Sequence, residues 1–190
     1  MTMKKKTLLS IDHVPFYDQN TLENWKEKGL LSKEHALFWS RKACGIACVK
    51  MIAEAFRKDK VPFGSLIHEA FSAGAYKEGV GWIHAKIAEF VSEKFKLESV
   101  AERNVSVDSM RKIIESGGLI IASIGFGFYR GKSGHLIVVL GCEIKNGVVN
   151  GFYVHHPSSK KELCMNRGFV HIKKFINSFS GNIIKINKNI

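Results

Sequence analysis

The chain has no long apolar run and no Cys-x-x-Cys pair. No stretch approaches the roughly twenty consecutive apolar residues that a membrane-spanning helix needs. The apolar run near the N-terminus is cut short at Asp12 and His13, well below the length of a signal peptide's apolar region. Four cysteines occur in the chain: Cys44, Cys48, Cys142 and Cys164. Because 190 residues are enough to fold without disulfide bonds, we expect free thiols in a soluble, cytoplasmic protein.

Acidic residues are scarce, with 17 Asp and Glu against 29 Lys and Arg, for a net charge of +12. This excess is compatible with nucleic acid, an anionic membrane surface or an acidic substrate. The basic residues are spread along the chain, without a long basic block or an interleaved basic and aromatic pattern. We therefore interpret the charge as a solvated surface and do not expect a nucleic-acid partner. Arg41 and Lys42 are of interest because they precede Cys44 and would lower its thiol pKa.

Repeats, low-complexity segments and interdomain linkers are also missing, which predicts a single domain over residues 1–190. Apolar positions at helical spacing predict helices over residues 44–58, 64–73, 82–94 and 107–116. Residues 8–16 are expected to be extended, because Pro15 disfavours helix at the residue before it. The polar segment 20–38 is expected to hold only a helical turn and a loop.

The second part of the chain has the pattern of a sheet. Continuous apolar runs predict buried strands over residues 119–124 and 135–141, and a third strand follows over 148–155. We expect a mobile glycine-rich loop over 125–134 and a turn over 142–147, where Asn146-Gly147 is a hairpin signal. Residues 169–175 and 183–186 are expected to add a strand and a helical piece. The order predicts an α+β fold, with N-terminal helices packed on a C-terminal antiparallel sheet.

Cys44 and His135 are the candidate catalytic pair. Cys44 opens the strongest predicted helix, where unsatisfied N–H groups and the positive end of the helix dipole favour a thiolate. His135 stands at the mouth of an apolar strand, from which it can face Cys44 across a cleft. A cysteine and a histidine so placed predict nucleophilic catalysis through a thioester. An inert buried cysteine and a structural core histidine are the competing interpretations.

The chain resembles the C39-like branch of the papain-like cysteine peptidases, small bacterial proteins, in the order and spacing of four segments. They are residues 14–19 (VPFYDQ), 43–47 (ACGIA), 134–141 (GHLIVVLG) and 153–157 (YVHHP). The resemblance covers about residues 12–160 and implies a papain-like fold. It also implies a cysteine peptidase or amidase that cleaves a peptide, protein or related amide substrate, without a cofactor or a metal ion.

The resemblance implies a role for each matching residue. Cys44 would be the nucleophile, His135 the general base, and Gln19 a donor to the oxyanion together with the backbone N–H of Cys44. His156, chosen over its neighbour because a proline follows it, stands where the family usually has an orienting Asp. A neutral His156 can accept a hydrogen bond from His135, but it brings no negative charge to stabilise an imidazolium.

Gly81, Trp82 and Gly134 are expected to line the substrate cleft. The glycines around Gly134 suggest a close approach of backbone at that point. The long segment between Gln19 and Lys42, and the loop over 125–133, would set specificity.

Two other functions are compatible with the same residues. Cys44, Cys48, His135 and His156 offer four soft ligands for a zinc ion, although their spacing matches no standard zinc motif. Alternatively, the exchange of the usual Asp for His156, with the basic charge, suggests an impaired scaffold that binds a peptide or an acidic partner.

Overall fold

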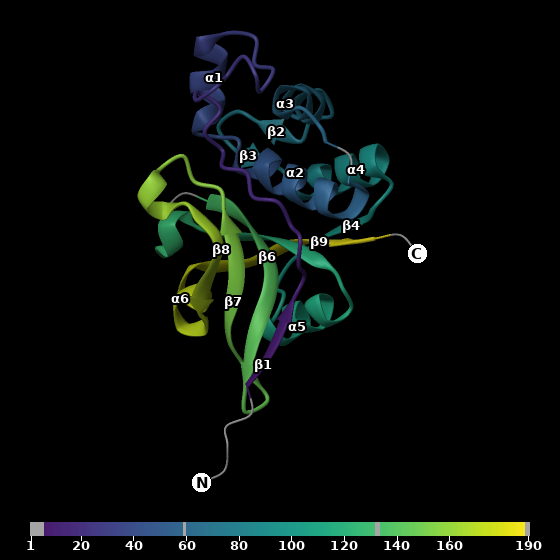
Figure 1. The fold of residues 1–190 in the computed structure, drawn as a ribbon, viewed down its shortest axis with the longest axis vertical. Coiled ribbons are helices and arrows are strands. Elements are labelled where there is room, and N and C mark those ends of the chain that lie inside the picture. Colours follow the sequence, from purple (N-terminus) through teal and green to yellow (C-terminus); the bar gives the residue numbers. More distant parts are fainter. Residues whose placement is uncertain (1–5, 59, 132–133, 189–190) are drawn as a thin grey trace.

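A seven-stranded antiparallel sheet runs through the molecule and carries helices on both faces (Figure 1). The computed structural model describes residues 6–58, 60–131 and 134–188. The strands of the sheet are β1 (Lys6–Ser10), β4 (Glu98–Glu102), β5 (Leu119–Gly125), β6 (Gly134–Lys145), β7 (Val148–His156), β8 (Met165–His171) and β9 (Phe179–Asn187). Their order is β4-β9-β5-β6-β7-β8, and β1 pairs with the second half of β6. A separate two-stranded ribbon joins β2 (Tyr76–Lys77) to β3 (Gly81–Trp82).

Helices cover the sheet unequally. They are α1 (Lys33–Ser40), α2 (Cys44–Arg57), α3 (Phe63–Ser72), α4 (His84–Phe95), α5 (Val107–Glu115) and α6 (Ile172–Ser178), with short 3-10 turns η1 (Phe126–Phe128) and η2 (Lys161–Leu163). The group α1–α4 lies on one side, and α5 and α6 lie on the other (Figure 1). None of the helices in the described residues combines the length and apolar character needed to cross a bilayer.

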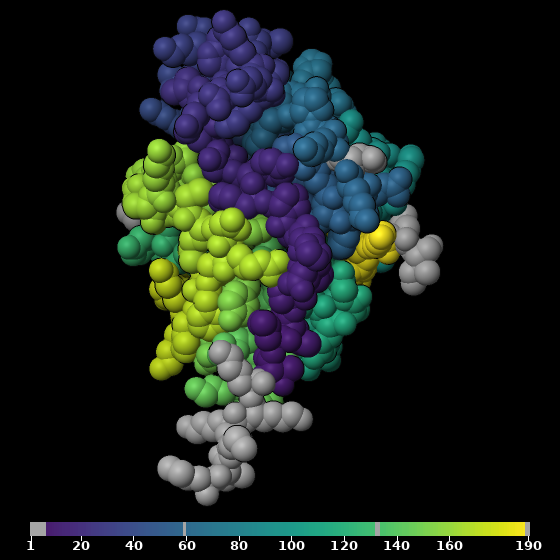
Figure 2. Space-filling model, viewed as in Figure 1, coloured from purple at the N-terminus to yellow at the C-terminus, as the bar shows by residue number. Residues whose placement is uncertain are grey.

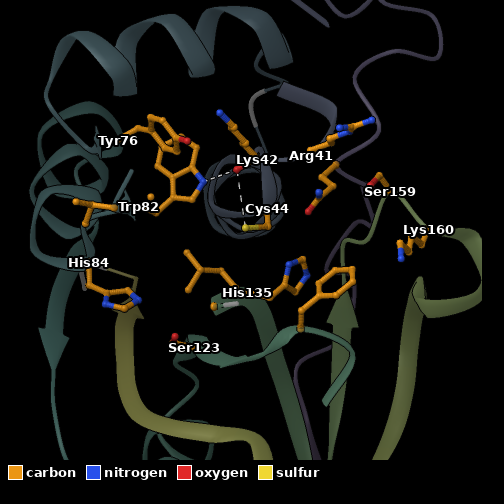
Figure 3. A pocket seen from close by; sticks show the side chains of 16 residues that line it. Arg41, Lys42, Cys44, Tyr76, Trp82, His84, Ser123, His135, Ser159 and Lys160 are labelled. Carbon is orange, nitrogen blue, oxygen red and sulfur yellow. Dashed lines mark hydrogen bonds between the residues drawn. The ribbon is translucent and has the colours of Figure 1, made fainter. Parts of the chain in front are cut away.

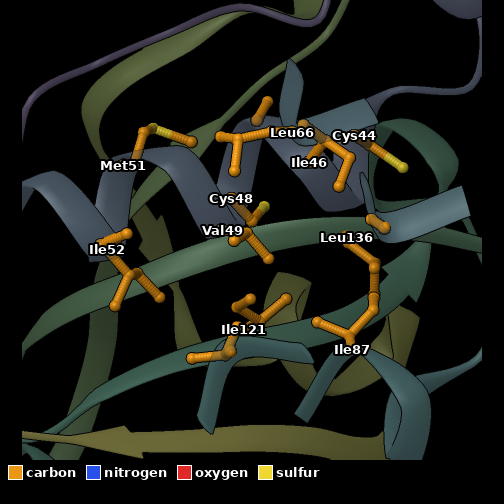
Figure 4. Packing of buried hydrophobic residues seen from close by; sticks show 14 of the residues in the cluster. Cys44, Ile46, Cys48, Val49, Met51, Ile52, Leu66, Ile87, Ile121 and Leu136 are labelled. Carbon is orange, nitrogen blue, oxygen red and sulfur yellow. The ribbon is translucent and has the colours of Figure 1, made fainter. Parts of the chain in front are cut away.

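Two hydrophobic cores form because successive residues of the central strands point to opposite faces. Ile121 and Leu136 face the core beneath α2 and α4, as Figure 4 shows. Their neighbours Ile120 and Ile137 face the second core, under α5 and α6. The continuous apolar runs of β5 and β6 are therefore central strands covered on both faces.

The N-terminal segment ties the two halves of the molecule together. Figure 2 shows it in purple, running over the surface from β1 towards α1 beside the C-terminal strands. The Arg167 guanidinium of β8 fixes it by donating to Ser10 Oγ at 2.6 Å and to the Ile11 carbonyl at 2.7 Å. The segment thus leads from β1, which pairs with the second half of β6, to the side of α2, where Tyr17 contacts Glu54.

The predicted α+β architecture is confirmed, and the four predicted helices and three apolar strands are present. The hairpin predicted at Asn146-Gly147 is also confirmed, because both residues have positive φ, 54° and 80°, as a tight two-residue turn requires. The turn itself is shorter than expected, because β6 continues to Lys145. The helix predicted from residue 82 begins at His84, since Trp82 pairs in the ribbon with Tyr76.

Several predictions near the ends of elements were wrong. The sheet also gains strands that were not predicted, β1 before the first helix and β4 between α4 and α5. The segment 20–38 contains most of α1, which begins after Ser32 and buries Ala36. Residues 183–186 lie inside β9, and residues 169–175 span the end of β8 and the start of α6. In the expected mobile loop 125–134, η1 is an ordered turn, and residues 132 and 133 lie outside the described residues.

Candidate active site

A cavity of about 770 Å³ opens at the N-terminus of α2 and gathers most of the predicted site residues (Figure 3). Those that line it are Gln19, Cys44, Gly81, Trp82, Gly134 and His135. They come from the N-terminal segment, α2, β3 and the start of β6, which are distant in sequence. His156 does not line the cavity but packs behind His135.

Cys44 is the first residue of α2, so its side chain lies among the unsatisfied N–H groups of a helix start. The residue before it, Ala43, offers no capping side chain. The Cys44 thiol donates weakly to the Lys42 carbonyl at 3.9 Å, and the side chain is only 8% exposed. The backbone N–H of Leu136 also points to the sulfur, which brings the start of β6 against the start of α2.

The expectation of a resting thiolate is wrong, because burial outweighs the helix dipole. Burial raises the pKa of Cys44 to about 11, and the N–H groups of Leu136, Gly45 and Cys44 offset this only in part. Arg41 and Lys42 do not lower this pKa as expected. Burial also lowers the pKa of His135 to about 3, with a smaller contribution from His156. At rest, a neutral thiol and a neutral imidazole therefore line the same cavity, and His135 Nε2 has no hydrogen-bond partner in the described residues.

Gln19 is held at the cavity by the end of α1. Its Nε2 donates to the Ser40 carbonyl at 3.0 Å, and the residue is 3% exposed. An amide nitrogen has two hydrogens, so one N–H remains for a ligand in the cavity. Two residues earlier, the Tyr17 hydroxyl donates to Glu54 Oε2 at 2.6 Å and fixes the same segment to α2. The helix that the sequence prediction missed thus positions a predicted site residue.

His135 and His156 lie ring on ring, with centroids 4.4 Å apart and an interplanar angle of 27°. The hydrogen bond that a neutral His156 can accept from His135 is not formed, because both ring nitrogens of His156 are buried without a partner in the described residues. Phe126 meets the edge of His135 at 5.3 Å between centroids, and Phe128 packs on His156 at 5.5 Å. Turn η1 therefore packs its two phenylalanine rings against the two imidazoles.

The neighbouring histidine, His155, has a structural role on the other face of β7. Its Nδ1 accepts from the Arg167 backbone N–H at 2.9 Å, so Nε2 carries the hydrogen and donates to the Val14 carbonyl at 3.2 Å. Of the two adjacent histidines, it is His156 that reaches His135. The choice made from the position of Pro157 named the histidine that contacts His135, but His156 does not line the cleft as that choice expected.

Trp82 is fixed against the start of α2. Its Nε1 donates to the Lys42 carbonyl at 2.6 Å, and Trp39 and Tyr76 pack around its indole. A Cβ on Gly45 would lie 2.8 Å from the indole ring, so only glycine allows Trp82 to lie this close. No role was predicted for Gly45 from the sequence, although its place directly after the candidate nucleophile was an available signal.

Neither a family model nor a curated protein matches this sequence. Solved structures do match its fold. A protein described as a C39-like peptidase from Bacillus anthracis superposes with a TM-score of 0.65 at 14% identity, over 96% of this chain and 98% of that one. The chain has the fold of the C39-like peptidases.

Two further structures share the fold. The peptidase domain of Streptococcus ComA, a bi-functional ABC transporter involved in a quorum sensing pathway, has a TM-score of 0.55 at 14% identity. That match covers 78% of this chain and 93% of the domain. A double glycine motif protease from an AMS/PCAT transporter, solved with its leader peptide, has a TM-score of 0.52 at 15% identity, covering 77% and 84%.

Glycine is required in this C39-like fold at positions other than Gly134, where the sequence predicted a close approach of the backbone. A Cβ on Gly134 would meet nothing within 4 Å, so the predicted close approach is wrong there. The close approach is at Gly125, where a Cβ would lie 1.9 Å from the Tyr129 carbonyl oxygen. Gly81 has φ +95°, a backbone conformation that other residues rarely adopt.

The geometry gives the zinc hypothesis no support. Cys48 is fully buried in the apolar core beneath α2 (Figure 4). In the ranges 6–58, 60–131 and 134–188, no three His, Cys, Asp or Glu side chains form a group that could hold a metal ion. The cavity is instead lined by three cationic residues for which the sequence predicted no binding role, Arg41, Lys42 and Lys160.

Proposed function

We propose that this protein is a cysteine peptidase or amidase that cleaves a peptide or related amide bond through a thioester on Cys44. The observation that carries the proposal is that Cys44, His135 and Gln19, from three separate segments, line one cavity at the start of α2. They supply a nucleophile, a base and a hydrogen-bond donor, the groups that acyl transfer requires.

The first half-reaction forms the thioester. Cys44 Sγ bonds to the substrate carbonyl carbon while its proton passes to the His135 imidazole, and the carbonyl π electrons move to oxygen. Gln19 Nε2–H and the Cys44 backbone N–H donate to the oxyanion. When the carbonyl re-forms, the carbon–nitrogen bond breaks and the leaving amine takes the proton from His135.

The second half-reaction restores the enzyme. His135 removes a proton from water as the water oxygen attacks the thioester carbonyl, and the same donors hold the new oxyanion. Collapse breaks the carbon–sulfur bond and releases the carboxylic acid, while the proton on His135 returns to the sulfur. In each half-reaction His135 therefore first accepts a proton as a base and then donates it as an acid, as general acid–base catalysis requires.

The neutral resting pair determines how the proton moves. Since burial disfavours both the thiolate and the imidazolium, proton transfer accompanies attack on the carbonyl and does not precede it. The stacked His156 and the Phe126 ring hold the His135 imidazole in one orientation without a carboxylate. The absence of a negative partner then lowers the rate but leaves the base in place.

A peptide substrate is supported by the fold as well as by the site. One of the solved structures with this fold, the double glycine motif protease, was determined in complex with a leader peptide. The cavity here offers about 770 Å³ and the indole of Trp82, enough for side chains next to a scissile bond. We infer an extended peptide segment as the substrate.

The proposal is tested by alkylation with a panel of peptidyl acyloxymethyl ketones, in which Cys44 Sγ bonds to the methylene carbon, the carboxylate leaves and a stable thioether remains. Peptide mass mapping should place this thioether on Cys44 in the native protein and in the control Cys142→Ala. It should be lost in Cys44→Ala and strongly reduced in His135→Ala. Equal labelling of Cys164, or labelling of Cys44 that does not depend on His135, would contradict the proposal.

A further inference from the structure

The charged side chains that line the cavity are all cationic. Arg41, Lys42 and Lys160 contribute to its wall, and no Asp or Glu of the described residues does. The neutral forms of Cys44 and His135 add no negative charge, and the start of α2 adds partial positive charge. A cleft lined by charge of one sign focuses the electric field and concentrates ligands of the opposite sign.

These cations differ from the basic residues elsewhere in the fold, many of which have acidic partners. Examples of paired residues are Lys50 with Glu54, Lys94 with Glu69, and Arg111 with Asp108 and Glu115. The Arg41 side chain, by contrast, has no hydrogen bond or ion pair to any residue that the structure describes. The Lys42 and Lys160 ammonium groups lie over aromatic rings, those of Phe38 at 3.6 Å and Phe126 at 5.7 Å. The cleft thus presents cations with no internal counter-charge.

The wall of the cavity is also asymmetric about the nucleophile. Figure 3 shows Arg41 and Lys160 on one side of Cys44, and the rings of Tyr76 and Trp82 on the other. Arg41 follows α1 and Lys160 follows β7, so two separate elements bring the positive charges together. A substrate lying across Cys44 would meet cations at one end and aromatic surface at the other.

We infer that the substrate carries a carboxylate next to the scissile bond on the Arg41 and Lys160 side, and an apolar side chain on the Trp82 side. This inference rests on the proposed function, because it names the substrate class of the same site. A guanidinium fork matches the two oxygens of a carboxylate, and an ammonium group adds a second charge-assisted hydrogen bond. The carboxylate has two possible sources, an Asp or Glu side chain or the C-terminus of a peptide.

The test uses internally quenched peptides that differ at single positions on either side of one cleavable bond. Each position carries Glu or its neutral isostere Gln, and each peptide is made with a free and with an amidated C-terminus. The native protein reports kcat/KM, and Cys44→Ala reports the dissociation constant of the uncleaved peptide. We expect Glu to be favoured over Gln by roughly tenfold on one side of the bond only, with the preference shrinking as salt is raised.

Three variants locate the preference on the protein. Arg41→Gln and Lys160→Gln should each reduce the ratio of kcat/KM for the Glu peptide to kcat/KM for the Gln peptide, whatever their effect on the Gln peptide itself. The matched control is Lys173→Gln, which removes the same charge from an exposed position on α6 and should keep the full ratio. If the preference for Glu over Gln fell equally in all three variants, it would depend only on the net charge of the protein, and the inference would be overturned.

The remaining outcomes separate this inference from the proposed function. A preference for the free C-terminus alone identifies a terminal carboxylate, and a preference for internal Glu identifies a side chain. Cleavage with equal kcat/KM for Glu and Gln at every position overturns the inference and leaves the peptidase in place. A Glu preference in binding to Cys44→Ala without cleavage by the native protein supports the carboxylate site and contradicts the proposed activity. Failure of every peptide to bind overturns the inference, while labelling of Cys44 by the acyloxymethyl ketones still tests the proposed function.

Discussion

The imidazole rings of His135 and His156 stack with their centroids 4.4 Å apart, and no hydrogen bond joins them. The third residue of a catalytic triad orients the base by accepting a hydrogen bond from it. A stacked ring instead orients the base by van der Waals contact with the face of the imidazole. The ring nitrogens of His156 have no hydrogen-bond partner in the described residues, so they form no polar contact with His135. Its contribution is the position that it imposes on His135.

We therefore expect His156→Phe to preserve activity and His156→Ala to lose it. Phenylalanine keeps a stacking surface behind His135 and removes two buried, unpaired nitrogens. It should retain kcat within about threefold and raise the free energy of unfolding by about 1 kcal/mol. Alanine leaves a cavity and frees the His135 ring, and should lower kcat by tenfold or more, on the order expected when a base loses its orientation.

Peptide cleavage assays and urea unfolding measure both effects. The matched control is His155→Phe, which breaks the hydrogen bonds to Val14 and Arg167 and should destabilise the fold instead. If His156→Phe abolished activity while folding normally, a polar role for His156 would replace the stacking role.

The two stacked histidines should also make stability depend on pH. Burial lowers the pKa of His135 from 6.5 to about 3 and that of His156 to about 4. Between pH 6.5 and these values the unfolded chain binds more protons than the folded one. The free energy of unfolding should therefore be fully maintained above pH 6.5 and fall as the pH drops towards 4, by at most about 1.4 kcal/mol per pH unit for each histidine.

Urea unfolding at several pH values between 7.5 and 4 measures this slope. Because carboxylates also titrate at the acid end, the informative quantity is the difference from His156→Phe, which should have a shallower slope. The control replaces an exposed residue that carries no ionisable group, Leu31→Gln, and should leave the slope unchanged. Identical slopes for the native protein and His156→Phe would show that His156 is not held neutral by the fold.

The sequence was sufficient for the parts of the site that depend on local pattern. The N-terminal position of Cys44 on a helix follows from apolar spacing, and its order with Gln19 and His135 follows from the resemblance. Helix α1 escaped prediction because its stability comes from tertiary contacts, chiefly the packing of Trp39 on the rings of Tyr76 and Trp82. Such contacts join residues some forty positions apart and leave little local periodicity.

The protonation states of Cys44 and His135 could not be predicted from the sequence for a related reason. A helix N-terminus and two basic neighbours argue for a lowered thiol pKa, but burial of Cys44 has the opposite sign and is larger. Burial depends on how β6 and α2 meet, which no single segment encodes. The interior place of β9 was likewise unpredictable, because its pairing with β4 and β5 joins segments that are distant in sequence.

Gln19 gives a prediction that separates catalysis from binding. Gln19→Ala removes the side-chain donor to the oxyanion and should lower kcat by about a hundredfold with a small change in KM. It also removes the hydrogen bond to Ser40, so part of the loss could come from a displaced segment. The control Thr21→Val removes the neighbouring bond to the Ala36 carbonyl, 2.6 Å long, without touching the cavity. Thr21→Val should reduce the unfolding free energy but leave kcat nearly intact, and a similar loss of kcat in both variants would assign Gln19 a structural role.

The contact of Gly45 with Trp82 gives the sharpest structural prediction. In Gly45→Ala the new Cβ would lie 2.8 Å from the indole, which is itself fixed by its hydrogen bond to the Lys42 carbonyl. We expect a loss of about 1–3 kcal/mol in unfolding free energy, as for other overpacked sites, and a weaker preference for apolar side chains on the Trp82 side of the substrate.

Gly134→Ala is the matched control for this variant. It adds the same methyl group to another glycine of the same cavity, where nothing lies within 4 Å, and should cost less than about 0.5 kcal/mol. The double variant Gly45→Ala with Trp82→Ala relieves the clash, so it should be more stable than the sum of the two single variants predicts. Strict additivity in urea unfolding would mean that Gly45 and Trp82 do not constrain each other, and the close approach at the start of α2 would then need another cause.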